Sequence, residues 1–347
     1  MMKKNFRNRL LAVTAAAASS FLLLSGFDSA LTVQDVNDHM REALSSMGGF
    51  SADMNATADI LLDVAMGEQS QSIPITGSMD MSVQLVEEPF ALAVSGNAAG
   101  DASAMGVAGS IDLDMYLLTQ EDGSGVAYVR FPQGGDEAWH AAALSAEDME
   151  KYTGAIKAAL SGNASEAFSS QLGTQVDVTN ELMEMATENM ILAPEAVSVN
   201  GVDCYEMTQS IDGNTLFEII SKVVEAVPTS GLDASSLSAF QMFFDGIRVD
   251  TVTDVAVDTF QPVYAGIDLS GSDFSALGQL LGSMMFSSQD ASSAAPQIGV
   301  TVNALNCSIN YSEAPAEIIV PEEALAAEIE TTLALSDVAA AAATTVG

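Results

Sequence analysis

Two histidines, His39 and His140, are the only side chains of this 347-residue chain whose ordinary pKa suits proton transfer near neutral pH. A solvated position on a helix explains His39, which follows Asp38. His140 lies in a strand-like run and could activate a serine, but no Gly-x-Ser-x-Gly motif is present to hold that nucleophile. Dinucleotide-binding glycine motifs and P-loops are also missing, so nucleotide binding has no support. Hydrolysis is therefore only a third choice of function.

The two cysteines, Cys204 and Cys307, lie far apart, and neither belongs to a Cys-x-x-Cys or other metal-type spacing. In an exported protein they could form one disulfide or stay as two buried thiols, and the sequence leaves both possibilities open. The acidic residues are dispersed and often alternate with apolar ones, as solvent-facing groups do, and no calcium-loop motif occurs. We expect neither a metal site nor a cofactor.

Methionine is frequent, with 18 residues, and many of these methionines alternate with polar residues. From residue 52 to residue 66 this alternation predicts a long strand with one dry face, and it recurs over residues 79–85, 90–94 and 111–117. Residues on the dry face could line a cavity for a hydrophobic ligand or could fill an ordinary core, because a flexible thioether suits both. The candidate cavity-lining residues are Met54, Ile60, Leu62, Met79, Met81, Val83, Leu85, Phe90, Leu92, Leu113 and Met115.

Short turns join these strands into an antiparallel meander, and we expect the turns at residues 87–89, 96–100 and 121–125. Helices punctuate the strands without alternating with them, which argues against a parallel doubly wound sheet. The helical periodicities cover residues 34–47, 145–160, 179–192, 213–227, 234–244 and 274–286. Later strands are expected at residues 197–200, 204–211, 247–258, 263–269 and 298–311. The pattern predicts an α+β fold.

The amino terminus has the features of a secretory signal. Four basic residues precede an apolar run that ends near Leu24, and this run is too short to span a membrane. The stretch LLLSGFDSA resembles the end of a lipoprotein signal, but Phe27 replaces the cysteine that would be lipidated. We therefore expect a secreted protein of the cell envelope without a lipid anchor. Its net charge of −37 repels nucleic acid and anionic membrane surfaces.

Four segments carry a resemblance to a known family: LTVQDVNDHMREALSSMGGFSADMNATADI, GVAYVRFPQGGDEAWHAA, VNGVDCYEMTQSIDGNTLFEII and IIVPEEAL. In these and in its order of elements, the chain resembles the extracytoplasmic lipoproteins of Gram-positive bacteria that share the LolA/LppX half-barrel fold. The resemblance implies a strongly curved antiparallel half-barrel sheet packed around helices, with an apolar cavity that holds an acyl chain in better-known members. Phe27 departs from the anchored members of the family.

These observations predict one LolA-like domain over residues 31–330, after a signal peptide over residues 1–30 and before an Ala- and Thr-rich tail over residues 331–347. The predicted protein is not an enzyme. It binds or carries a lipid or another hydrophobic molecule in an apolar cavity. The alternative is a cell-surface interaction or sensor module with a filled core, and another envelope protein is then the expected partner.

Overall fold

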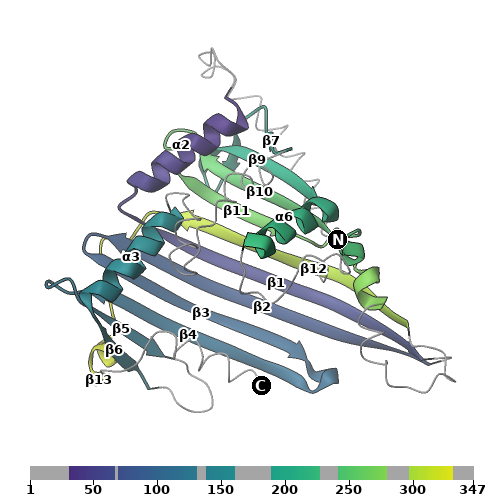
Figure 1. Ribbon diagram of the computed structural model, residues 1–347, viewed down its shortest axis with the longest axis horizontal. Coiled ribbons are helices and arrows are strands. Elements are labelled where there is room, and N and C mark those ends of the chain that lie inside the picture. The colour runs from purple at the N-terminus through teal and green to yellow at the C-terminus, as the bar shows by residue number, and fades with distance from the viewer. Residues whose placement is uncertain are drawn as a thin grey trace.

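One broad, mostly antiparallel sheet dominates the structure (Figure 1). The computed structural model describes residues 31–66, 69–130, 138–160, 189–226, 241–279 and 297–330. The helices of these residues are α2 (Val33–Ser46), α3 (Ala146–Leu160), α6 (Gly213–Ala226) and α9 (Glu322–Leu325). The strands are β1 (Gly49–Met66), β2 (Gln69–Glu87), β3 (Phe90–Ala102), β4 (Val107–Thr119), β5 (Gly125–Arg130), β6 (His140–Leu144), β7 (Ile191–Leu192), β8 (Val197–Val199), β9 (Val202–Asp212), β10 (Arg248–Ala256), β11 (Pro262–Asp268), β12 (Gln297–Ser312) and β13 (Ile329–Glu330).

The sheet joins two regions of the chain through its central strands. Its order is β13-β6-β5-β4-β3-β2-β1-β12-β11-β10-β9-β7, and β8 pairs with β9 outside this path. Strands β1 to β6 form the expected meander, in which each strand pairs with the next. Strand β12, from the other end of the chain, pairs along β1 and connects the meander to β11, β10 and β9. Among the described strands, only β13 runs parallel to its neighbour, β6.

The length of β1 follows from its period-two sequence, because successive residues of a strand point to opposite sides of the sheet. Met54 lies opposite Met81 of β2 and Ile309 of β12. Its neighbour Asn55 lies opposite Asp80 and Ser308. The sheet therefore has an apolar face, on the side of Met54, and a polar face, on the side of Asn55.

The turn expected at residues 96–100 is wrong. These residues lie inside β3, and the chain turns instead at the 3-10 segment Ser103–Met105, which ends at Gly106 with a φ of +80°. Gly96 is required for close packing, because a Cβ there would lie 2.8 Å from the carbonyl oxygen of Asp80 on β2. The glycine thus marks a close approach between two strands and does not mark a turn.

The first two predicted helices begin at side-chain caps. Thr32 and Asp35 form a reciprocal capping box at the start of α2. At α3 the Ser145 hydroxyl donates to the Asp148 carboxylate at 2.7 Å, and the Asp148 amide donates to the Ser145 hydroxyl at 3.1 Å. These bonds satisfy amide donors that the first helical turn leaves without backbone partners.

Four predicted helices fall partly outside the described residues, and the one predicted at residues 213–227 is described as far as Ala226. Of the helix predicted at residues 179–192, the described end forms strand β7, so that end of the prediction is wrong. Residues 241–243, within the predicted 234–244 helix, form a 3-10 turn, and residues 275–279 begin the predicted 274–286 helix. The signal peptide and the tail also lie outside the described residues.

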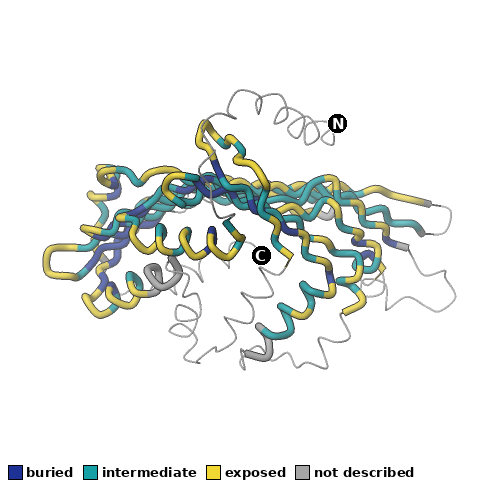
Figure 2. Tube along the Cα trace, turned by 90° about the horizontal axis from the view of Figure 1, so that it is seen from above, coloured by how far each residue is buried: buried dark blue, intermediate teal, exposed yellow. Residues whose placement is uncertain are grey.

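The strong curvature expected of a half-barrel is not seen. Figure 2 shows the strands as one broad layer that is not strongly curled, with the longer helices α2, α3 and α6 on one side of it. The strand order is open, since the outermost strands β13 and β7 pair with β6 and β9 and not with each other. A sheet closes into a barrel only when its edges meet. The described chain is therefore a wide open sheet with α2 and α3 packed on its apolar face, while Ala324 of α9 packs against Val126 and Tyr128 on the other face.

Candidate functional site

All eleven candidate residues lie on the apolar face. The register brings them together in rows that run across neighbouring strands, because directly paired residues share a face. One row joins Met54, Met81, Gly96 and Leu113. The next joins Val83, Val94 and Met115 through β2, β3 and β4. The two-residue alternation in the sequence therefore assigned every candidate to the correct face of the sheet.

The apolar face is packed at one end and half-buried beyond it. Leu85 is 1% exposed, and it forms a core cluster with Phe90, Leu117 and Met149 of α3, among others. The other nine candidates are half-buried. A second cluster lies where α2 packs on β9 and β10, around Val36. Two of the candidates thus belong to the core, and the half-buried ones extend along the strands away from it.

Strand β12 adds apolar residues to this face that the sequence reading did not assign to it. Its apolar side chains fall at even positions up to Val302 and at odd positions from Leu305, which would put them on opposite faces of a regular strand. The register shifts between Asp59 and Ile60 of β1, so that Asp59 pairs with Ala304 and Ile60 pairs with Val302. The bulge absorbs one residue and returns both groups to the apolar face. The break in the two-residue alternation of β12, between Val302 and Leu305, was the sequence signal that could have revealed this bulge.

A row of very small residues crosses the apolar face. Ala58, Gly77, Gly100 and Gly109 are paired in sequence across β1, β2, β3 and β4. A Cβ added at Gly109 would have no atom within 4 Å, and one added at Gly100 would have only a carbonyl oxygen at 3.9 Å. Space is thus present above the backbone of β3 and β4 along this row.

Carboxylates on the polar face are paired with neutral donors. The Asn55 amide donates to Asp80 at 2.6 Å, and the Asn97 amide donates to Asp112 at 2.5 Å. Both pairs sit directly across neighbouring strands. The arrangement confirms that these alternating acidic residues lie on the face opposite the apolar one.

A cation joins this polar face between β4 and β5. Arg130 of β5 forms an ion pair with Asp114 of β4, and its guanidinium lies 4.9 Å from the centre of the Trp139 ring. The Trp139 ring in turn lies 5.8 Å from that of Tyr116. Burial raises the pKa of the Tyr116 hydroxyl, and the nearby Asp114 carboxylate raises it further. The cluster ties β4, β5 and the start of β6 together.

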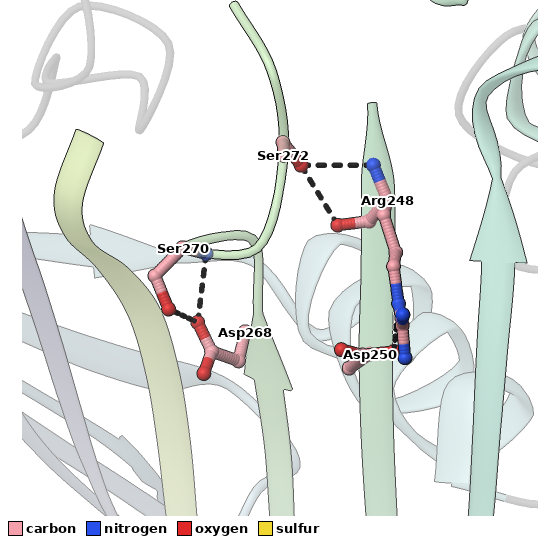
Figure 3. Close-up of polar contacts among 5 residues, drawn as sticks. All are labelled: Arg248, Asp250, Asp268, Ser270 and Ser272. Atoms are coloured by element: carbon pink, nitrogen blue, oxygen red, sulfur yellow. Dashed lines mark hydrogen bonds and ion pairs between the residues drawn. The ribbon is translucent and has the colours of Figure 1, made fainter. Parts of the chain in front are cut away.

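Polar contacts also fasten the ends of β10 and β11 (Figure 3). The Arg248 guanidinium donates to Asp250 at 2.9 Å, while the Arg248 amide donates to the Ser272 hydroxyl at 2.8 Å. On β11 the Ser270 amide donates to Asp268 at 2.8 Å. The bond to Asp268 stabilises the turn after β11, and the bond to Ser272 joins the segment that follows this turn to the start of β10.

The residues considered for catalysis lie on separate elements. His39 is on α2, where its ring lies 4.7 Å from that of Phe260. His140 begins β6, which lies near the opposite end of the strand order from β9 and β10. In the described part of the chain, no three His, Cys, Asp or Glu side chains are placed to hold a metal ion. None of the described helices is long and apolar enough to cross a membrane.

Both cysteines are free thiols, so the structure contains no Cys204–Cys307 disulfide. Cys204 is on β9 and Cys307 is on β12, with β10 and β11 between them. Strands lie roughly 4.8 Å apart, which separates the two residues by far more than the roughly 7 Å that a disulfide tolerates between Cα atoms. Burial, followed by the negative charge of Asp254, raises the pKa of the Cys204 thiol to about 11.

No protein-family model and no curated protein matches the sequence. Solved structures do show similarity. LprF from Mycobacterium bovis aligns over 84% of this chain and 96% of its own, with 12% identity and a TM-score of 0.30. The MucA/MucB complex of Pseudomonas aeruginosa aligns over 86% and 63%, with 10% identity and a TM-score of 0.22. A putative outer membrane lipoprotein-sorting protein domain from Vibrio parahaemolyticus aligns over 83% and 93%, with 10% identity and a TM-score of 0.19. The chain is thus similar to LprF, to the MucA/MucB complex and to a lipoprotein-sorting domain.

Proposed function

We propose that this chain is a secreted, non-enzymatic protein of the bacterial cell envelope that binds a lipid or another hydrophobic molecule on its apolar face. The observation that carries the proposal is the run of half-buried aliphatic and methionine side chains beyond the packed cluster at Leu85. Half-buried apolar residues are costly to leave in contact with water when they adjoin one another across several strands. A bound acyl chain would cover them.

The small-residue row from Ala58 to Gly109 gives the ligand a place to lie. An acyl chain placed along it would run across β1, β2, β3 and β4 between flanking side chains such as Met79 and Ile75. Each buried methylene contributes about 0.8 kcal/mol, and part of this gain offsets the cost of ordering the ligand. Methionine side chains would adapt to ligands of different shape because they are unbranched and flexible.

Two matched phenylalanine substitutions test the proposal. Ala56 lies on the apolar face between Met79 and Cys307, and the adjacent Thr57 lies on the polar face, where it is exposed. A fluorescent acyl probe should bind the parent protein with a dissociation constant near the micromolar range. Ala56→Phe should weaken binding by at least about tenfold, because the ring occupies the ligand's space, and Thr57→Phe should leave binding unchanged.

Native mass spectrometry of gently purified protein gives an independent readout, since a carrier should retain co-purified lipid. The opposite result would be a parent that neither holds lipid nor binds the probe, together with an Ala56→Phe variant destabilised by about 1–3 kcal/mol through overpacking. That outcome would refute ligand binding and favour the interaction or sensor module with a filled core.

Export without an anchor is a separate part of the proposal. It is supported by the basic and apolar start of the chain and by Phe27 at the lipobox position. The intact mass of exported protein should show the loss of roughly 26–30 residues and no acyl adduct. A diacylglyceryl mass shift would contradict it.

A further inference from the structure

One carboxyl group is buried on the polar face without a neutralising partner. Asp254 of β10 is 3% exposed, and its Oδ1 atom has no hydrogen-bond partner. It lies directly opposite Glu206 of β9 and Tyr264 of β11. This is unlike the pairs at Asn55 and Asn97, where a neutral amide satisfies each carboxylate.

The turn between β8 and β9 passes over the same face close to this position. Asn200 at the turn donates its side-chain amide to Asn310 of β12 at 3.4 Å. Asn310 pairs with Tyr264, which pairs with Asp254, so the turn reaches across the row that contains the buried carboxyl group. The β8–β9 hairpin, residues 197–204, therefore lies over the polar face of β10 and β11.

Few interactions hold the hairpin down. Val197 and Val199 pack against a small cluster of Cys204, Ala256 and Val263. The Asn200–Asn310 bond is long for a hydrogen bond. Strand β8 has only three residues, and it pairs with β9 alone. A segment with this little support opens more easily than the central strands.

Among the described residues, the charges shown to act on Asp254 and on the adjoining Cys204 are negative. Glu206 faces it from β9, and Asp203 and Asp258 carry negative charge near the adjoining Cys204 thiol. The cations whose side chains are described, on α2, β5, α3, α6 and at the start of β10, pair with carboxylates other than Asp254. Burial first, and then the charge of Glu206, raises the pKa of Asp254 to about 7.

We propose that Asp254 is the proton-sensitive element of a latch, in which its protonated carboxyl group keeps the β8–β9 hairpin closed over the polar face and ionisation favours an open hairpin. An ionised carboxylate beside Glu206 is poorly tolerated without water. Lifting the hairpin, whose Val197 and Val199 pack against Ala256 two residues along β10, would admit water to this carboxylate. This inference does not depend on ligand binding at the apolar face.

The direction of the pH effect follows from proton counting. The closed hairpin holds Asp254 at a pKa of about 7, and a solvated carboxyl would return toward 3.8. Between these values the closed state binds one more proton than the open state, so it loses stability as pH rises. The equilibrium constant for hairpin opening should therefore increase about tenfold per pH unit between these two pKa values and stay constant at higher pH.

Amide hydrogen exchange on the full chain tests the latch. After correction for the intrinsic pH dependence of exchange, the opening constant of residues 197–204 should rise between pH 4 and pH 7, roughly tenfold per unit, while amides of β1 to β4 should show no such rise. Asp254→Asn should remove the dependence. Asp250→Asn, on the same strand and face, should retain it. Equal pH dependence in the parent and in Asp254→Asn would overturn the proposal.

Two further measurements keep the test decisive if Asp254→Asn does not fold. Carboxyl NMR of the parent should show Asp254 titrating near neutral pH, and titration at an ordinary aspartate pKa would overturn the proposal. Glu206→Gln removes the like charge, so the plateau in hairpin opening should begin at a lower pH. A plateau that does not move would show that the carboxyl pair does not control the hairpin.

Discussion

Truncation of Leu85 to alanine should separate the packed end of the apolar face from its half-buried region. Leu85 is 1% exposed and is enclosed by side chains of β3, β4, β5, β6 and α3, including Phe90, Leu117 and Met149. Such a site cannot collapse easily around the missing atoms, so we expect a loss of about 3–4 kcal/mol in the free energy of unfolding. Leu113→Ala, on the same face but half-buried, should cost about 1 kcal/mol, because part of that side chain already contacts water.

Urea denaturation followed by the fluorescence of Trp139, the only tryptophan, measures both variants. The urea concentration at the unfolding midpoint should fall more for Leu85→Ala than for Leu113→Ala. The slope of the unfolding free energy against urea concentration should stay unchanged. Thr57→Ala, an exposed change on the polar face, should shift the free energy by less than about 0.5 kcal/mol. Equal losses at Leu85 and Leu113 would refute the reasoning, since they would mean that the whole face is packed alike and leaves nothing for a ligand to cover.

Three other predictions concern the polar face, the thiols and a helix cap. Arg130→Gln should shift the emission of Trp139 but cost only about 0.5–1 kcal/mol in urea denaturation, because the ion pair with β4 is partly exposed. Thiol titration in denaturant should find two free thiols, and in native protein at pH 8 Cys204 should react much more slowly than Cys307, since its pKa is raised to about 11. Hydrogen bonds from the first turn of α6 lower the pKa of Asp212. The amides of α6 should therefore lose protection from hydrogen exchange as pH falls through that lowered value, whereas the protection of α6 in Asp212→Ala should not change with acid there.

Local patterns in the sequence predicted the strands and their faces well. The alternation around Met54 specified a long strand, and every candidate side chain was placed on the correct face, because the period of a strand is fixed by its backbone geometry. The start of α3 was equally readable, since the spacing of Ser145 and Asp148 is itself the capping interaction.

Features that depend on distant partners could not be predicted in this way. Gly96 looked like part of a turn, but its role is set by how closely β2 approaches β3. The pairing of β12 with β1, and the bulge near Ala304 that keeps its side chains in register, bring together opposite ends of the chain. The packing of the β8–β9 hairpin on β10, near Asp254, depends on valines that carry no distinguishing pattern in the sequence. Curvature is likewise a property of the assembled sheet and not of one strand.

The pairing of β1 with β12 has a consequence for how the chain acquires its structure. Residues 51–65 find their partners at residues 297–312, so the middle of the sheet cannot form until almost the whole domain is available. Such high contact order predicts slow folding. Until β12 arrives, the meander presents β1 as an unpaired edge, which is a template for association with other chains. The aspartates spaced along β1 would then act as gatekeepers against aggregation, a task distinct from any they perform once the sheet is complete.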